Sequence, residues 1–347
     1  MSRFSKGVIA LATMVAFTMA CSQQSSAASS WAFTDDSANL GLTGVSPHVE
    51  RTGSVDRLWY SGGPAGTAVA DCTSAGSCTA VAANWGTPIN DVSLATFGGV
   101  KRENFKKMDP MSGTQAVYSA PCLTADCVSI GAATLTSEQM KVSTSVKAWG
   151  VPDAVELPGG AGVRIYIVES PTMTSSCPEK VASYTAADGV TFVKDAGYRF
   201  SKDGFVDTEI LRATTGSWLM IMSDGPGCGN TQELYMSDST DGLTWSNPVA
   251  ITGSDKSRLD PTGYETSPGS NVFKVYFATS AGRQDMNFTI GSGTLKVAAA
   301  SSSATTTATA KAGAACTKAG AKASVTVAKK KTTLTCKTVK KKLVWSK

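Results

Sequence analysis

The sequence predicts an all-β protein: a five-bladed β-propeller followed by a small β module that a disulfide closes. Three observations carry this prediction. Glycine, serine and threonine are abundant among the 347 residues, while long stretches with helical periodicity are hard to find. A pattern of about 50 residues recurs along the chain, which is typical of propeller blades. A chemically different, lysine-rich segment follows the last repeat.

The first element, residues 1–28, reads as an export signal. Arg3 and Lys6 supply the positive start, and the apolar run that follows is too short for a comfortable membrane span. The residues "TMAC" end at Cys21 and resemble a bacterial lipoprotein cleavage box, with Thr18 where Leu is usual. Cleavage near Ala28, after "SSAA", is the alternative. We therefore expect an exported protein, either extracellular or a lipoprotein at the cell surface.

Cysteine parity agrees with export. Of nine cysteines, eight remain if Cys21 is lipidated, and an even set in an exported chain indicates disulfides. A metal site is disfavoured because His48 is the only histidine and no cysteine pair has zinc spacing. Many pairings are allowed; the spacing favours Cys72–Cys78, Cys122–Cys127, Cys177–Cys228 and Cys316–Cys336.

The repeats occupy residues 29–298. The segments 152–169 and 206–223 align, with Asp153 and Asp207 each nine residues before a glycine that precedes an apolar strand. Asp260 has the same offset from Gly269, and Asp-Gly turns follow later at 188–189 and 241–242.

Two upstream segments extend the series. Asp109 in "MDPMSG" and His48 in "PHVERTG" take the same place, which gives five repeat starts. One small sheet cannot bury both of its faces, but neighbours around a ring can, so a propeller is favoured over a β-sandwich with coincidental similarity.

Charge separates the two ends of the chain. From Lys311 onward there are eleven lysines and no acidic residue, whereas the part between leader and tail holds 19 basic and 27 acidic side chains. We predict a flexible linker at 299–313 and a basic module at 314–347 that Cys316 and Cys336 would close. The tail is expected to attract anionic wall polymers or lipid headgroups. Nucleic acid is not favoured, because aromatic residues are not interleaved with the lysines.

The motifs "SDSTDGLTW", "YTAADGVTF", "MDP" and "LDPTG" resemble those of five-bladed glycoside hydrolases that act on arabinans, xylans and fructans. The Asp-Gly turns also resemble the Asp boxes of sialidase-like propellers. The last segment, which starts "CTKAG" and ends "KLVW", resembles a short C-terminal module of exported actinobacterial proteins.

The hydrolase resemblance implies that carboxylates at the start of each first strand do the chemistry. A base or nucleophile would come from blade one, an orienting Asp from blade two and an acid, usually Glu, from blade three. Asp109 fits the position in blade two, whereas Asp153 stands where blade three should have Glu, and His48 stands where blade one should have Asp.

We expect Asp109, Asp153, Asp207 and Asp260 to ring one mouth of the central channel, with Glu209 and His48 as further candidates. Such a ring of like charges would raise some pKa values. The alternative for each Asp is a structural one, in which it caps a turn or accepts backbone N–H groups. His48 could equally be a loop residue.

Other features are placed by the predicted topology. Cys177–Cys228 would join blades three and four on the mouth face, Cys122–Cys127 would stiffen the corresponding loop of blade two, and Cys72–Cys78 would span the opposite turn of blade one. The basic strip Lys101, Arg102, Lys106 and Lys107 is expected to be a solvated connection, or else to bind an acidic sugar.

Two functions remain open. The first is a glycoside hydrolase acting on carbohydrate, and the second is a non-catalytic propeller that binds glycan or another surface partner. We expect a monomer. No cofactor is required; a central Ca²⁺ bound through oxygen is the one metal considered, and the sequence assigns it no ligands.

Overall fold

The computed structural model describes residues 30–37, 39–62, 66–108, 114–141, 147–148, 150–170, 177–229, 231–282, 285–298, 322–327, 330–339 and 342–346. The chain divides into two compact units, of which the larger spans Ser29–Ala299. Within the described residues, no helix is long and apolar enough to cross a membrane. The leader with Cys21 and the linker 299–313 lie outside the described residues, so the predictions about them stay predictions.

The larger unit consists of five antiparallel sheets that follow one another along the chain. Blade one contains β2 (Val45–Thr52), β3 (Val55–Ser61), β4 (Thr67–Thr73) and β5 (Cys78–Val81). Blade two contains β6 (Asn90–Phe97), β7 (Val100–Met108), β8 (Gln115–Pro121) and β9 (Thr134–Leu135). Blade three contains β10 (Lys147–Ala148), β11 (Asp153–Glu156), β12 (Val163–Ser170), β13 (Lys180–Ala186) and β14 (Val193–Lys194). Blade four contains β15 (Phe205–Arg212), β16 (Trp218–Asp224), β17 (Leu234–Ser239) and β18 (Val249–Ala250).

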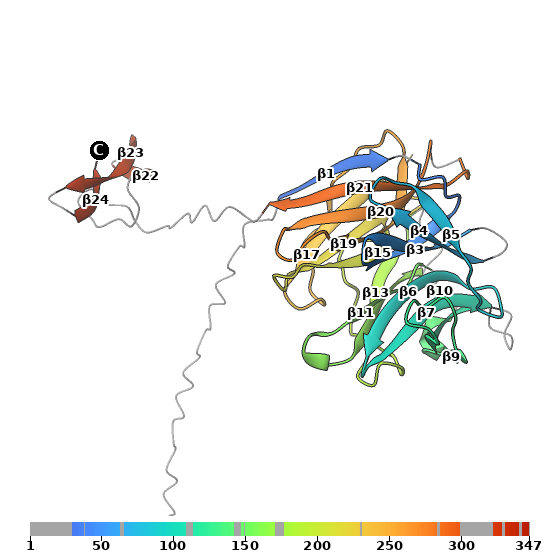
Figure 1. Ribbon diagram of the computed structural model, residues 1–347. Coiled ribbons are helices and arrows are strands. Elements are labelled where there is room, and N and C mark those ends of the chain that lie inside the picture. Colours follow the sequence, from blue (N-terminus) through green and yellow to red (C-terminus); the bar gives the residue numbers. More distant parts are fainter. Residues whose placement is uncertain are drawn as a thin grey trace, which may run out of the picture. The chain divides into compact units, whose positions relative to one another are not determined.

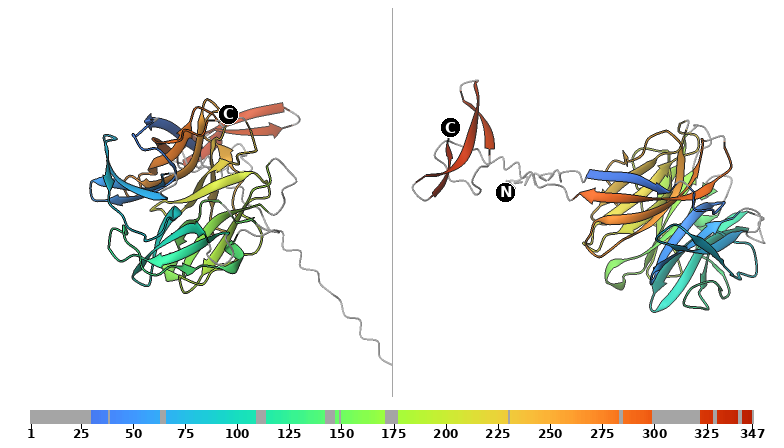
Figure 2. Two further views of the ribbon diagram at one scale, coloured as in Figure 1. Left: turned by 90° about the vertical axis from the view of Figure 1, so that its right-hand side faces the viewer. Right: turned by 45° about the horizontal axis from the view of Figure 1, so that its top comes forward.

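Blade five joins the two ends of the propeller sequence. Its strands β19 (Ser257–Glu265), β20 (Val272–Ser280) and β21 (Thr289–Ala298) are completed by β1 (Ser30–Ser37), which pairs antiparallel with β21. The two strands lie side by side in Figure 1 and in the right-hand view of Figure 2. The N-terminal strand therefore closes the ring, a pairing that the repeat pattern did not reveal.

The core confirms a ring of five. The described residues form five buried apolar clusters, and each cluster draws its side chains mainly from two neighbouring blades. Trp59 of blade one packs with Phe105 of blade two, and Tyr166 of blade three packs with Trp218 of blade four. Leu259 of blade five belongs to one cluster with blade one, so the last interface closes the circle. Each sheet thus buries both faces, as the all-β propeller prediction requires.

Three predicted disulfides are confirmed: Cys72–Cys78, Cys122–Cys127 and Cys177–Cys228. The first spans the turn between β4 and β5, and the third joins the loops between the second and third strands of blades three and four. Cys122–Cys127, however, follows β8 and lies between the third and fourth strands of blade two. Its predicted place was therefore wrong.

Blade two begins earlier in the chain than the repeat pattern predicted. Its inner strand is β6, and the "VKRENFKKM" segment, expected to be a solvated connection, is the second strand β7. The cations of this strand have partners: Lys106 pairs with Asp91 and Lys101 with Glu50, while Lys107 lies over the Tyr118 ring. Asp109 follows β7 and lies outside the described residues.

The C-terminal unit contains one small antiparallel sheet. Its strands are β22 (Lys322–Val327), β23 (Lys330–Val339) and β24 (Lys342–Ser346). Cys336 of β23 is disulfide-bonded and buried. Its predicted partner Cys316 lies outside the described residues, so that pairing stays a prediction.

Candidate functional site at the channel mouth

The inner strands of four blades share one irregularity near their start. In each, the pairing register shifts, and the residue in the bulge has a left-handed backbone: Ser46 (φ 52°), Asp91 (φ 53°), Asp207 (φ 54°) and Asp260 (φ 49°). This conformation is uncommon outside glycine and is best tolerated by Asp and Asn. The bulges give blades one, two, four and five equivalent, buried side chains at the start of their inner strands, a position here called the channel mouth.

Blade three differs because its inner strand is broken. Two short pieces, β10 and β11, pair separately with β12, and Pro152, which has no N–H to donate, lies between them. The residue equivalent to Asp207 is Val151, two positions before Asp153. Blade three therefore places no carboxylate in this layer.

Asp207 and Asp260 form a carboxyl pair. They are hydrogen-bonded to each other, which requires one of them to hold a proton. Burial raises the pKa of Asp207 to about 6, and burial followed by the charge of Asp207 raises that of Asp260 well above its ordinary value. Asp260 also accepts the Ser46 N–H at 2.9 Å, and Asp207 accepts the Ser223 hydroxyl at 2.9 Å. Asp260 thus holds the shared proton.

Asp91 has the opposite electrostatics in the same layer. Burial favours its neutral form, but the Lys106 ammonium, 2.5 Å away, outweighs burial and holds the pKa of Asp91 below its ordinary value. The Ser61 hydroxyl donates to the carboxylate at 3.2 Å. The mouth therefore combines an ionised carboxylate with a nearby pair that retains a proton.

A second layer lies two residues further along the inner strands. Its members are His48, Ser93, Asp153, Glu209 and Thr262, one from each blade. Each accepts a backbone N–H from the next blade around the ring. The pairs are Leu94 N–H to His48 Nε2 (3.3 Å), Ala154 N–H to Ser93 Oγ (2.9 Å), Ile210 N–H to Asp153 Oδ2 (2.8 Å), Gly263 N–H to Glu209 and Val49 N–H to Thr262 Oγ1 (3.2 Å). These five hydrogen bonds form a closed circle that joins the blades.

Two carboxyl groups of this second layer also share a proton. Glu209 is hydrogen-bonded to Asp153, and burial followed by the charge of Asp153 raises the pKa of Glu209 far above its ordinary value. Burial raises the pKa of Asp153 to about 6. Both side chains are already committed to neighbouring blades, so their geometry supports the structural alternative.

His48 is buried in β2 and is not a loop residue. Burial, followed by the charge of Lys101, lowers its pKa to about 3, so its imidazole is neutral at physiological pH. With Nε2 accepting the Leu94 N–H, the side chain acts as an inter-blade acceptor.

The structure thus corrects the predicted alignment of the site. Asp207 and Asp260 are hydrogen-bonded to each other in the first layer, but Asp153 and His48 belong to the second layer, beside Glu209. Sequence reasoning missed Asp91, although its strand ends in the Gly98-Gly99 turn and is followed by another strand, as in the other repeats. The offset from Asp91 to Gly99 is eight residues instead of nine, which hid the match.

A metal centre has little support among the described residues. Their one cluster of at least three close ligand-type groups is Cys177, Glu179 and Cys228, where both cysteines are oxidised to a disulfide. The cluster therefore offers a single carboxylate. The mouth carboxylates could offer oxygen to a hard cation, and a central Ca²⁺ stays a prediction.

Comparison with known proteins supports the architecture. No protein-family model matches the chain, and no curated protein matches it either. Among solved structures, it is similar to a thermostable family-43 glycoside hydrolase (13% identity, 74% of this chain and 89% of that chain, TM-score 0.53). It is also similar to the GH43_1 enzyme from Xanthomonas citri complexed with xylose (11% identity, 75% of this chain and 90% of that chain, TM-score 0.52). A third similar structure is the GH43 endo-arabinanase from Bacillus licheniformis (10% identity, 77% of this chain and 96% of that chain, TM-score 0.51).

At such low sequence identity, the structural similarity shows a shared fold alone. The chain has the five-bladed propeller architecture of family-43 glycoside hydrolases, which confirms that part of the predicted resemblance. The likeness of its turns to sialidase Asp boxes and of its last segment to a known C-terminal module stay predictions.

Proposed function

We propose that this protein is an exported glycoside hydrolase whose active groups lie at the channel mouth. The observation that carries the proposal is the electrostatic contrast between Asp91 and the pair Asp207–Asp260. Glycoside hydrolysis needs one carboxyl group that donates a proton and another that is ionised, and environments that push two pKa values apart are typical of such assignments.

In the proposed mechanism, the pair Asp207–Asp260 donates its proton to the leaving oxygen as the glycosidic bond breaks. Asp91 either activates a water molecule, taking its proton, or attacks the sugar carbon directly to form a glycosyl ester, which water then hydrolyses while the pair takes the proton of that water. Lys106 keeps Asp91 ionised, and the Ser46 N–H and the Ser223 hydroxyl orient the pair. Activity should decline in acid as Asp91 is protonated, and in alkali as the pair loses its remaining proton.

A specific observation favours a second candidate function, non-catalytic glycan binding. Blades one and three, where the hydrolase resemblance implies a base and an acid, supply Ser46 and Val151 at the mouth. The carboxylates come from blades two, four and five instead. A binding propeller would use the same mouth without turnover.

One assay separates the two candidates. Purified residues 29–347 are offered a panel of aryl glycosides and polysaccharides, beside Asp91→Asn and Asp207→Asn. If the mouth is catalytic, each substitution lowers kcat by about 10²–10⁴-fold, the usual contribution of an acid or base. Asp188→Asn, in a turn at the opposite ends of the strands, is the control and should keep wild-type turnover. Retained glycan binding with no turnover of any substrate by the wild type would establish the second candidate.

The location of the protein belongs to the same proposal. We expect export, a lipid anchor at Cys21, carbohydrate as the main partner, and attraction of the basic tail to anionic wall polymers or lipid headgroups. Cys21→Ser should release the protein from the membrane fraction into the medium, measured by immunoblotting of both. Unchanged membrane retention would contradict lipidation and favour cleavage near Ala28.

A further inference from the structure

A cavity of about 460 Å³ lies away from the channel mouth, between blades three and four. One wall is the segment after β14, with Asp195, Tyr198, Arg199 and Ser201. The other wall, residues 243–245, belongs to the turn between β17 and β18. This turn is at the opposite end of its blade from the start of the inner strand, and hence from Asp207.

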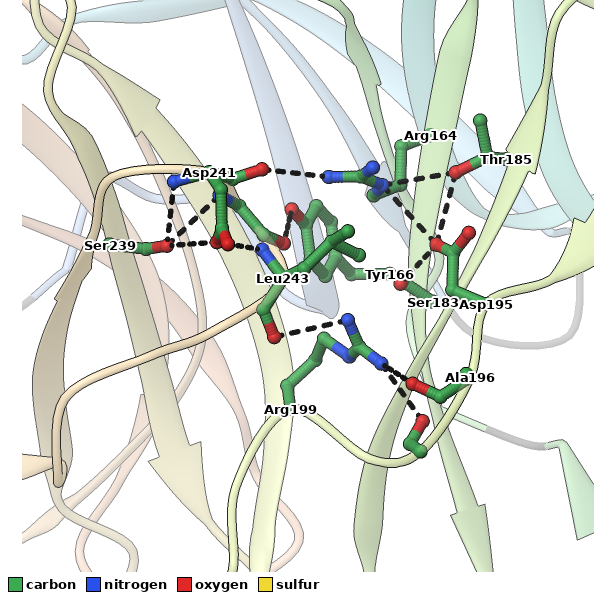
Figure 3. A network of polar contacts seen from close by, with 12 residues as sticks. Arg164, Tyr166, Ser183, Thr185, Asp195, Ala196, Arg199, Ser239, Asp241 and Leu243 are labelled. Carbon is green, nitrogen blue, oxygen red and sulfur yellow. Dashed lines mark hydrogen bonds and ion pairs between the residues drawn. The ribbon is translucent and has the colours of Figure 1, made fainter. Parts of the chain in front are cut away.

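Arg199 holds the two walls together. Its guanidinium donates to the Leu243 carbonyl at 3.1 Å and to the carbonyls of Ala196 (2.7 Å) and Gly197 (2.9 Å) (Figure 3). The side chain is buried, yet its Nε has no hydrogen-bond partner. This nitrogen has almost no accessible surface, so Arg199 holds the walls together and the exposed lining residues are the ones that can contact a ligand.

The charge of the cavity is already balanced. Asp195 accepts from Arg164 at 3.2 Å and from the hydroxyls of Ser183 and Thr185 (Figure 3). The charged lining residues are one carboxylate, Asp195, and one guanidinium, Arg199, so a free anion would meet the first and a free cation the second. This favours an uncharged ligand.

The remaining lining combines aromatic rings with hydroxyls. Trp245 and Tyr198 are partly exposed, and Ser201 and Thr244 are exposed. The Trp245 indole packs edge-on against Tyr166 at 6.0 Å and donates to the Gly242 carbonyl, which holds the ring in place. Fixed aromatic rings beside a few polar groups suit a ligand with apolar faces and hydroxyl edges.

We propose that this cavity is a second carbohydrate-binding site, which takes a neutral sugar unit with the Trp245 ring along one face and the Ser201 and Thr244 hydroxyls at its hydroxyl edge. Its volume falls in the range of about 300–1,000 Å³ that is typical of small-molecule sites. The site goes beyond the proposed catalysis and does not depend on it.

The test uses the full-length exported protein and three neutral disaccharides: xylobiose, arabinobiose and cellobiose. Binding is measured by calorimetry and by saturation-transfer NMR. Ser201→Trp fills the cavity from an exposed position, and Ser267→Trp, which adds the same bulk at an exposed turn of blade five, is the control. Ser201→Trp should weaken binding of at least one disaccharide by about tenfold or more, as expected for blocking an aromatic contact, and the control should not.

Trp245→Phe provides a second variant that keeps an aromatic ring at this position, as in blade three, where Phe192 follows the equivalent turn. It should weaken binding less than Ser201→Trp while the protein stays folded.

The proposal is overturned if the wild type binds none of the disaccharides, or if Ser201→Trp binds them all as the wild type does. Binding that survives in Ser201→Trp but is lost in Asp207→Asn would assign all recognition to the mouth. If the wild type turns over no substrate but its disaccharide binding is weakened by Ser201→Trp, the hydrolase proposal is refuted and the second binding site is supported.

Discussion

At the scale of the residue, the surroundings of His48 in the propeller set both its protonation state and its hydrogen-bonding role. The side chain is nearly inaccessible and its Nε2 is used as an acceptor, so protonation would both bury a charge and break the inter-blade hydrogen bond. A histidine next to a proline in a bare sequence is compatible with a loop, a base or a ligand. Only its place in the second layer of the channel decides among them.

We predict that His48 keeps a neutral imidazole from pH 8 down to about pH 4, because its pKa in the folded protein is about 3. The unfolded chain binds this proton below about 6.5, so the free energy of unfolding should fall as pH drops from about 6.5 to about 3. As the chain has one histidine, its imidazole signals can be followed by NMR without assignment. A midpoint near 6.5 would contradict the buried acceptor role.

At the scale of the element, the inner strands of the blades share one backbone feature, a bulge near their start, but differ in the side chain that it carries. Four inner strands carry a left-handed bulge, but only three of them place a carboxylate there. Two residues later, the second-layer side chains accept backbone N–H groups from the next blade through a hydroxyl, an imidazole or a carboxyl group. Because backbone N–H groups need only an acceptor, the residue type at this position can vary while the circle stays closed.

The Asp-Gly turns are the elements that sequence reasoning described best. Asp241 Oδ1 accepts the N–H groups of Leu243 and Thr244, both at 2.7 Å, and Asp188 Oδ1 does the same for Val190 and Thr191. The turn of blade four also contacts blade three, because Tyr166 donates to the Gly242 carbonyl at 2.6 Å. A side chain at residue 242, where φ is 69°, would collide with Tyr166 and Arg164.

We therefore predict that Asp241→Ala lowers the free energy of unfolding by about 1–2 kcal/mol, the usual cost of losing such turn acceptors. Burial opposes ionisation of Asp241, but the two N–H groups outweigh it and lower its pKa. Its contribution should be present at neutral pH and be lost as pH falls below the ordinary carboxyl range. Urea unfolding at pH 7 and pH 3 measures both effects. Asp241→Asn, which keeps an acceptor, should cost less, and an equal cost for the two variants would refute this account.

At the scale of the whole molecule, ring closure is the decisive feature. β1 pairs with β21 along its length, and Phe33 packs edge-on against Phe277 at 5.8 Å. A strand from the N-terminal end thus completes the sheet formed by the C-terminal end of the propeller sequence. Without it, blade five would have an unpaired outer edge.

Deleting residues 30–37 should lower the free energy of unfolding by more than about 3 kcal/mol, since backbone pairing and a large aromatic contact are lost together. Thermal unfolding followed by circular dichroism would show this as a lower and broader transition. Truncation after residue 298 is the matched control, because it removes the separate C-terminal unit and leaves β1 paired. Equal stability of the two truncated proteins would contradict a closing role for β1.

The sequence by itself determined the features of this protein that depend on residues close together in the chain. The β class, the Asp-Gly turns and the disulfides Cys72–Cys78 and Cys122–Cys127 follow from short-range patterns such as turn chemistry and cysteine spacing. Cys177–Cys228, whose cysteines are 51 positions apart, follows from the repeat length instead. The start of blade two was wrong because a local "MDP" match outweighed the true start at Asp91, whose turn is one residue shorter.

Only the tertiary structure decided which carboxyl groups meet. Asp91, Asp207 and Asp260 become one site because bulges in three separate strands turn toward one channel, and Lys106 and burial then set their protonation. The partner of β1 is likewise determined by closure of the ring. The pairing of β1 with β21 and the hydrogen bond from Ser46 to Asp260 join residues more than 200 positions apart, and the energies of all these contacts depend on burial and distance, which no local pattern specifies.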